Sequence, residues 1–425
     1  MALSGRPDGP PVLAPAALAS WAGERLGALR QLAGARWRLG DVDGGALLGE
    51  RAAIFGYRRR GAVSPSGTCR LLRCRDGDVV AANLPRDDDW RAVPAWLEDE
   101  RLGDLVEGDR ELAWTRLTER LSRVAARELV ERARLLGLAV APVAAPPTSD
   151  TPVVFERVRG RGGGPRSADA TPRVVDLSSL WAGPLCGHLL AGAGARVIKV
   201  ESTRRPDGAR GGPRAFFDLL NAGKESVALD FRAPQDRAAL AGLIEAADIV
   251  IEGSRPRALR QLGVDAETVV ARSSGKVWVS ITGYGRTEPE SEWVAFGDDA
   301  SAAAGLVAAT ALAARADEPV FCGDAIADPL AGIGAALVAL RAWTAGESAL
   351  FGVSLCGVVR HVLAALPMPD GARVRRATAG ADGFEVVAGD EVVAVASPRA
   401  RSTGGVASEL GADTADVLTS LGIRC

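Results

Sequence analysis

The chain has 425 residues, of which 47% are hydrophobic, and its formal net charge is −2. This length can bury a core in two or more domains, and the balanced charge argues against a nucleic-acid partner. The start has no apolar stretch behind a basic one, and no later run is long and uncharged enough to span a bilayer, so we expect a cytoplasmic protein without a membrane partner.

Residue types that bind metals or form disulfides are few. The six cysteines show no spacing typical of a zinc site or a disulfide framework, so we expect reduced thiols. The two histidines, His188 and His361, lie in apolar helical surroundings, where a packed imidazole is commoner than a ligand. We therefore expect no metal site, and carboxylates and backbone groups must carry most of any chemistry.

The front of the chain has an α+β pattern. An apolar helical region at 16–35 precedes strand-like alternation in TCRLLRCRDGDVVAANL. Helical patterns follow in WRAVPAWLEDE and ARELVERARLLGLAVAPV. The next distinct stretch, 158–172 (VRGRGGGPRSADATP), is rich in Gly, Arg, Ser and Pro and has the composition of a linker. It divides the chain in two.

The rear part alternates strands and helices. Strands are predicted at 174–177, 196–201, 226–231, 248–253 and 276–285, with helices between them. This alternation predicts an α/β fold with a doubly wound, Rossmann-like parallel sheet and a ligand site at the carboxyl ends of its strands. The first strand-to-helix turn, SSLWAGP, lacks the glycine pattern that binds a dinucleotide pyrophosphate, which disfavours an NAD-dependent oxidoreductase.

The segment CGDAIADPLAG at 322–332 places Asp328 directly before Pro329 and a long apolar helical run. An Asp at this position is typical of a helix cap, because its oxygens accept unpaired backbone N–H groups next to the positive end of the helix dipole. The same position would suit a nucleophilic carboxylate. The dipeptide alone leaves both interpretations open.

Residues 5–34 and 314–343 are similar to each other. When the two are aligned on their shared Pro-Val step, Ser20 falls where Asp328 stands. A weaker similarity links CRLLRCRDGDVVAAN with RRATAGADGFEVVAG. The alternative is chance similarity between alanine-rich helices.

Several ordered motifs resemble the family III CoA-transferases of the CaiB/BaiF type, the superfamily of formyl-CoA and carnitine CoA-transferases. They are VVDLSSLWAGPLCGHLLAGAGARVIKVE, NAGKESVALDF, ADIVIEGSRPRALRQLG, VWVSITGYGRTEP, FGDDASAAAGL and the region of Asp328, Gly332 and AALVALRA. The resemblance runs from about 173 to 366, and LGADTADVLTSLGI near the end is similar to the family's terminal segment. The ordered set is far more specific than any one motif.

The family's parts stand here in a rearranged order. Residues 76–143 resemble the family's small domain, although they precede the large one. We therefore expect a degenerate partial copy with a small α+β domain at 1–157, the linker at 158–172, a CoA-binding catalytic domain at 173–366, and a short C-terminal segment at 367–425. Ser20 then occupies the nucleophile position of a copy without activity.

The resemblance implies transfer of CoA from an acyl-CoA donor to a carboxylic acid acceptor. Asp328 would be the nucleophile and pass through an aspartyl anhydride and an aspartyl thioester. Leu180, Trp181 and Ala182 would lie next to the thioester, where backbone N–H groups at a helix start can stabilise an oxyanion. Lys224 matches the family's lysine beside the CoA adenine.

Arginines are the expected partners of the CoA phosphates. Arg204 and Arg205 follow a predicted strand, and guanidinium groups match phosphate oxygens. Arg255 lies in the turn GSRPR, which departs from the Asn-Phe-Arg-Pro-Gly common in the family. The structural alternative for each is a solvated surface arginine.

The resemblance implies no permanently bound cofactor, because coenzyme A is a substrate, and it implies an interlocked homodimer. Two other functions stay open. One is a CoA-binding relative without activity, and the other is a 2-methylacyl-CoA racemase or epimerase. The second is disfavoured because Gly297 and Asp298 stand where the racemase branch has a His-Asp pair.

Overall fold

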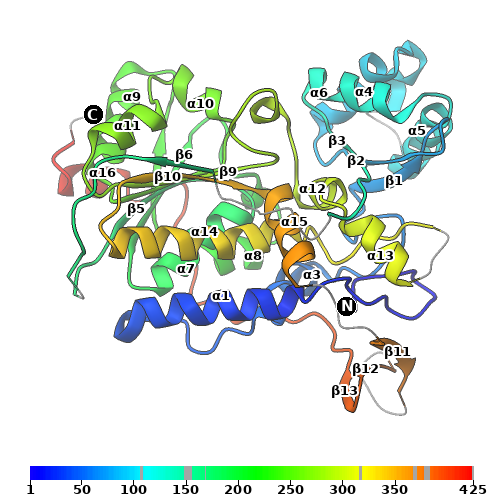
Figure 1. The fold of residues 1–425 in the computed structure, drawn as a ribbon. Helices are drawn as coiled ribbons and strands as arrows, with labels where there is room; N and C mark the ends of the chain where they lie inside the picture. Colours follow the sequence, from blue (N-terminus) through cyan, green and yellow to red (C-terminus); the bar gives the residue numbers. More distant parts are fainter. Residues whose placement is uncertain are drawn as a thin grey trace.

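The computed structural model describes residues 1–105, 109–147, 156–167, 169–314, 318–366, 371–377 and 383–423. A large α/β unit and a smaller α+β unit lie side by side, and a small antiparallel sheet lies apart from both (Figure 1). The predicted fold class, a doubly wound parallel sheet with a smaller α+β domain, is confirmed.

The large unit is built on a sheet that has seven strands in the described residues, in the order β4-β10-β9-β8-β5-β6-β7. All neighbours from β5 to β10 are parallel, and β4 is an antiparallel edge strand. Counted from β5, the parallel strands have the Rossmann order. The strands are β4 (Glu156–Arg159), β5 (Arg173–Leu177), β6 (Arg196–Ser202), β7 (Glu225–Leu229), β8 (Ile249–Glu252), β9 (Val277–Thr282) and β10 (Ala349–Ser354).

Alternate side chains of these strands enter two cores. Val174, Ile249 and Val279 face α7 and α14, whereas Val175 and Val250 face α9 and α11. Burial on both faces explains why the strands are almost uninterrupted apolar runs. The helices of this unit are α7 (Ala182–Gly192), α8 (Arg214–Asn221), α9 (Pro234–Ala246), α10 (Pro256–Gln261), α11 (Ala266–Arg272), α12 (Gly297–Ala303), α13 (Leu306–Ala314), α14 (Ala327–Thr344) and α15 (Leu355–Ala365).

Helix α1 (Leu18–Ala33) forms an outer layer against α14 (Figure 1). Trp21, Leu26 and Leu29 are buried in the same core as Leu337 and Leu340. Two short helices follow, α2 (Gly44–Leu47) and α3 (Glu50–Phe55). The first helices of the chain therefore pack as part of the large unit, although the sequence motifs assign them to the front copy.

The smaller unit has its own core. Its antiparallel sheet packs against three helices around Trp90, Trp96 and Trp114. The opposite face of the sheet contacts α12, where Cys69 and Ala81 meet Ala302. The elements are β1 (Cys69–Arg73), β2 (Val79–Asn83), β3 (Ala139–Pro142), α4 (Asp87–Leu97), α5 (Arg110–Leu121) and α6 (Ala126–Leu136).

The stretch with linker composition lies on the large unit where it is described. After β4, the backbone N–H groups of Gly160 and Gly163 donate to Ser348 and Gly346 at 2.7 Å each. A Cβ at Gly160 would lie 2.4 Å from the Val270 carbonyl oxygen. Its glycines thus permit close backbone contact along the sheet edge, which differs from a detached linker.

The C-terminal part contains β11 (Arg373–Arg376), β12 (Phe384–Ala388), β13 (Glu391–Ala394) and α16 (Thr414–Ser420). The expected boundary at 367 lies outside the described residues. Helix α16 packs against β7. Among the described residues, no helix is both long and apolar enough to cross a membrane.

Candidate active site

Asp328 lies in the first turn of α14 but does not cap that helix. The helix begins at Ala327, and its cap residue, Ile326, offers no side-chain hydrogen bond. The Asp328 carboxylate instead accepts hydrogen bonds from the backbone N–H groups of Ala182 and Gly297. The helix-cap interpretation is therefore wrong, because the carboxylate contacts the two neighbouring helices instead.

Ala182 and Gly297 are the first residues of α7 and α12, so three helix starts meet at one carboxylate. Each helix start places unpaired N–H groups and partial positive charge there, which favours an anion. A Cβ at Gly297 would lie 2.2 Å from Asp328 Oδ2, and one at Gly332 would lie 2.6 Å from the Ala182 carbonyl oxygen. The absence of side chains at these two positions allows the helices to approach.

Arg51 of α3 supplies a positive charge that acts on this carboxylate. Its Nε and Nη2 atoms donate to both oxygens of Asp324, at 2.8 and 2.6 Å. Asp324 is fully buried, and the Arg51 side chain is 22% exposed. The guanidinium also lies 5.1 Å from the centre of the Trp181 ring. Arg51 is therefore held by a bidentate ion pair and an aromatic face.

The surroundings of Asp328 raise the pKa of its carboxyl group toward neutral pH. Burial raises its pKa to about 6, while the positive charge of Arg51 lowers the pKa and the negative charge of Asp324 raises it. The hydrogen bonds from Ala182 and Gly297 favour the ionised form. At neutral pH the group is mostly a carboxylate, the form that can act as a nucleophile.

Asp298 fixes the turn that precedes Asp328. Its Oδ1 accepts the backbone N–H of Ala325 at 2.8 Å, and Ala325 has a φ of 41°. Burial and the negative charge of Asp324 together raise the Asp298 pKa to about 7, although Arg51 opposes the shift. A left-handed alanine costs energy, so the turn before Asp328 is maintained by these contacts.

Leu180 and Trp181 form the turn that begins α7. Leu180 has a φ of 71°, and its N–H donates to Asp207 at 2.9 Å. Asp207 also pairs with the buried Lys199 at 2.8 Å. Trp181 is 2% exposed and packs edge-on against Phe216, with ring centres 5.7 Å apart. The structure thus brings Leu180, Trp181 and Ala182 together at the start of α7, where Ala182 contacts Asp328.

The three predicted phosphate-binding arginines differ in their surroundings. Arg204 is exposed and donates to Asp230 at 3.1 Å. Arg205 is also exposed. Arg255 is partly buried; burial lowers its pKa, and Arg257, Arg86 and Arg205 lower it further. Arg205 and Arg255 therefore belong to one cluster of positive charge beyond the carboxyl ends of β6 and β8.

Lys224 lies in a different environment from the one predicted. It is buried, and its ammonium group donates to Asp176 at 2.8 Å, to the Pro184 carbonyl oxygen at 2.9 Å and to Asn221 at 3.0 Å. These acceptors use all three of its protons. In this structure Lys224 anchors the start of α7 to β5.

Sequence reasoning missed Arg51 and the Gly297 N–H. Arg51 comes from the front of the chain, 273 positions before its partner Asp324, and no local pattern links the two residues. Gly297 lies in the motif FGDDASAAAGL, where the racemase branch has a histidine, and this motif alone does not place its N–H group against Asp328. Its direct contact with Asp328 follows from the tertiary fold.

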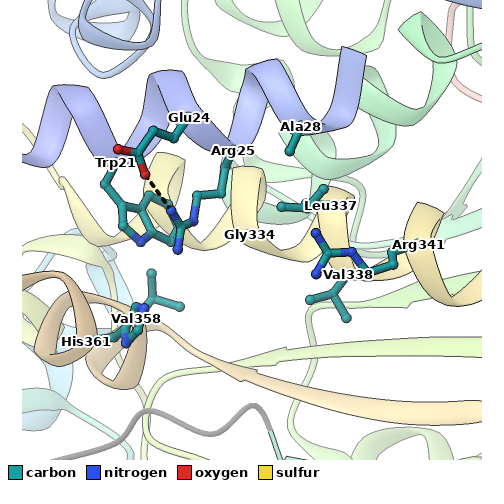
Figure 2. Close-up of a pocket in the computed structure, with 10 residues that line it drawn as sticks. All are labelled: Trp21, Glu24, Arg25, Ala28, Gly334, Leu337, Val338, Arg341, Val358 and His361. Carbon is teal, nitrogen blue, oxygen red and sulfur yellow. Dashed lines mark hydrogen bonds and ion pairs between the residues drawn. The ribbon is translucent and has the colours of Figure 1, made fainter. Parts of the chain in front are cut away.

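A groove of about 390 Å³ lies on the other half of α14, between α1 and α15 (Figure 2). Trp21, Arg25, Arg341 and His361 are among its lining residues, and Asp328 is not. The second histidine, His188, contacts Arg401 at 3.0 Å. Asp328 therefore lies outside this groove.

Comparison with known proteins matches residues 171–381 to a family described as "CoA-transferase family III". This segment belongs to CoA-transferase family III. One family relative is succinyl-CoA–D-citramalate CoA-transferase of Chloroflexus aurantiacus, 35% identical over 185 residues, which are 42% of this chain and 45% of the relative. Another is succinate–glutarate CoA-transferase of Agrobacterium fabrum, 31% identical over 45% of this chain and 52% of the relative.

The chain spans about half the length of these curated family relatives. Among solved structures, a CaiB/BaiF family protein from Brucella suis is 26% identical, with a TM-score of 0.42, over 51% of this chain and 65% of that one. The matched segment contains Asp328, Ala182 and Gly297, whereas Arg51 lies outside it.

Proposed function

We propose that this protein is a transferase that moves CoA from an acyl-CoA donor to a carboxylic acid acceptor, with Asp328 as the nucleophile. The observation that carries the proposal is a partly exposed carboxylate at three helix starts, inside the segment that belongs to CoA-transferase family III. The named relatives act on different acids, so the identity of donor and acceptor is left to experiment.

The proposed reaction begins when an Asp328 oxygen attacks the thioester carbonyl carbon. The C–S bond breaks, CoA leaves as the thiolate, and a mixed anhydride remains. The thiolate then attacks the aspartyl carbonyl, which releases the donor acid and leaves an aspartyl-CoA thioester. The acceptor carboxylate displaces the thiolate to form a second anhydride. The thiolate finally attacks the acceptor carbonyl, which gives the new thioester and restores Asp328.

The backbone donors have a second role in this proposal. In the free protein the N–H groups of Ala182 and Gly297 bind the Asp328 carboxylate. Once Asp328 is acylated, the same donors face the aspartyl carbonyl oxygen. They can therefore stabilise the oxyanion that forms each time this carbonyl is attacked, without any rearrangement of the helices.

Arg205 and Arg255 are the proposed partners of the CoA phosphates, and Leu180, Trp181 and Ala182 would lie beside the thioester. Two further contacts with CoA would be less direct. Arg204 would have to exchange Asp230 for a phosphate, and Lys224 would act through its bonds to Asp176 and Pro184, which hold the start of α7. The exposed Ser20, in the first turn of α1, is proposed to be without catalytic activity.

The assembly and location of the protein are also proposals. We propose a homodimer in the cytoplasm, with 1–157 and 173–366 as two partial copies of the family. Arg51 already reaches the Asp328 region within one chain. This contact supports the idea that the front copy supplies in the same chain what a second subunit supplies in an ordinary dimer.

The activity is tested by CoA exchange. Purified protein is mixed with succinyl-CoA or acetyl-CoA and a panel of carboxylic acids, and new thioesters are identified by mass spectrometry. We expect at least one donor and acceptor pair to react, and we expect Asp328→Ala to lose about 10³-fold or more of the rate. Tight CoA binding without exchange in any pair would instead favour the inactive relative.

The racemase alternative has its own readout. A chiral 2-methylacyl-CoA is incubated with the protein in deuterated water. Because no histidine stands beside Asp328 at position 297, we expect no deuterium at the α-carbon. Rapid exchange there would overturn the assignment as a transferase.

A further inference from the structure

Two buried oxygen atoms lack a donor where the smaller unit meets α12. They are Oδ1 of Asn83, at the end of β2, and Oδ2 of Asp299, in the first turn of α12. The Asn83 Nδ2 donates to Asp299 Oδ1 at 3.0 Å. Both residues are almost completely buried, with exposures of 2% and 0%.

A single proton would satisfy both atoms. A primary amide and a carboxylic acid can pair through two hydrogen bonds, one from the amide N–H to the acid carbonyl and one from the acid O–H to the amide oxygen. The first bond is present in the structure. An ionised Asp299 would instead place two unpaired acceptors together in a buried interface, and each would carry a desolvation cost.

The charges around Asp299 also disfavour its ionised form. Asp298 lies beside it on α12, and three further acidic groups interact with it: Cys69 from β1, Tyr284 after β9 and Cys356 from α15. None of these groups brings positive charge. Burial raises the pKa of Asp299 well above its usual value, and Asp298 adds to that effect.

We propose that Asp299 is a neutral carboxylic acid that joins Asn83 through two hydrogen bonds, and that this acid–amide pair positions the Gly297 N–H against Asp328. Asp299 Oδ1 also accepts the backbone N–H of Phe296 at 2.9 Å, which fixes the residue just before Gly297. Asp299 is thus a positioning residue. Its functional role rests on the proposed transferase activity, whereas its protonation state does not.

The protonation state is measured first by infrared spectroscopy at pH 8. The wild-type minus Asp299→Asn difference spectrum should contain the carbonyl band of a protonated carboxylic acid, shifted in deuterated water. The matched control is Asp88→Asn, the same chemical change at an exposed position of α4, which should give no such band. Absence of the band for Asp299→Asn would overturn the proposal, whether or not the protein transfers CoA.

Exchange of the two side chains tests the positioning role. Asp299→Asn keeps two complementary hydrogen bonds, so we expect kcat within about threefold of wild type. Asn83→Asp places two acids together, so kcat at pH 8 should fall about tenfold or more, with the KM for acyl-CoA within about twofold. The double variant Asn83→Asp/Asp299→Asn restores one acid and one amide and should recover most of kcat. A double variant as impaired as Asn83→Asp would contradict the pairing.

Discussion

The balance of charges and donors around the Asp328 side chain suits its proposed role as a nucleophile. Burial opposes ionisation, while Arg51 and two backbone N–H groups favour it, and the resulting pKa of about 6 leaves a carboxylate at neutral pH. A more strongly stabilised carboxylate would be a weaker nucleophile. At the residue scale, these local contacts therefore support the proposal that Asp328 is the nucleophile.

This balance predicts an acid limb in the pH profile of kcat/KM. Because the attacking form is the carboxylate, activity should fall as pH decreases through about 6. Arg51→Gln removes the charge that lowers the Asp328 pKa, so the midpoint should move toward about pH 7. The measurement is the pH dependence of CoA exchange at low acyl-CoA concentration.

The matched control for this shift is Arg51→Gln/Asp324→Asn. It removes the charge of Asp324 as well, which raises the Asp328 pKa in the wild type, so the midpoint should return toward 6. An unchanged midpoint in Arg51→Gln would show that Arg51 does not act on the nucleophile.

Only part of the site was predictable at this scale. Asp328 and the turn at 180–182 lie in motifs whose order along the chain carries the information. No sequence motif marks Arg51, because its place in the site depends on an ion pair with the distant residue Asp324. Lys224 matched a motif, yet its ammonium is occupied by Asp176, which sequence spacing does not reveal.

At the scale of elements, the site is a junction of the starts of α7, α12 and α14. The strands were predictable because burial on both faces leaves continuous apolar runs. The position of α1 was not, since an amphipathic helix does not specify which surface it covers. The composition of 158–172 also left its structure open. A glycine-rich stretch can form either a flexible linker or close backbone contacts, such as that of Gly160 with Val270.

This junction predicts the effect of a single methyl group. Gly297→Ala would place its Cβ against Asp328 Oδ2 and the Ala325 carbonyl oxygen, 2.2 and 2.4 Å away, so α12 must move. We expect about 10²-fold lower CoA exchange, because a displacement near 1 Å is sufficient for such a loss. Steady-state kinetics and thermal unfolding of the variant provide the check.

Gly27→Ala on α1 is the matched control. A Cβ there meets nothing within 4 Å, so activity should stay at the wild-type level and stability should rise by up to about 1 kcal/mol. If Gly297→Ala kept full activity, the close approach of α12 to the nucleophile would be irrelevant to function.

At the scale of the whole molecule, the front of the chain contributes residues that contact the helices around Asp328. Helix α1 packs on α14, and Arg51 forms an ion pair with Asp324. The smaller unit contacts α12 through Asn83. The order of the parts differs from that implied by the family resemblance, but the contacts bring them to one site. Sequence motifs identified the parts, and only the fold showed how they meet.

This arrangement predicts that activity does not depend on dimer formation. Each chain contributes its own Arg51 and Asp328, so the specific rate of CoA exchange should stay constant as the protein is diluted through any dimer dissociation. Sedimentation velocity at the same concentrations gives the assembly state. A specific rate that falls with the dimer fraction would mean that the partner subunit supplies part of the site.

The central claim, that Asp328 forms a covalent intermediate, is tested most directly by intact-mass analysis of protein mixed with a reactive acyl-CoA and quenched rapidly. The account predicts an adduct with the mass of CoA minus water on the wild type, located by peptide mapping to Asp328, and no adduct on Asp328→Ala. Equal adduct formation by wild type and Asp328→Ala would contradict it.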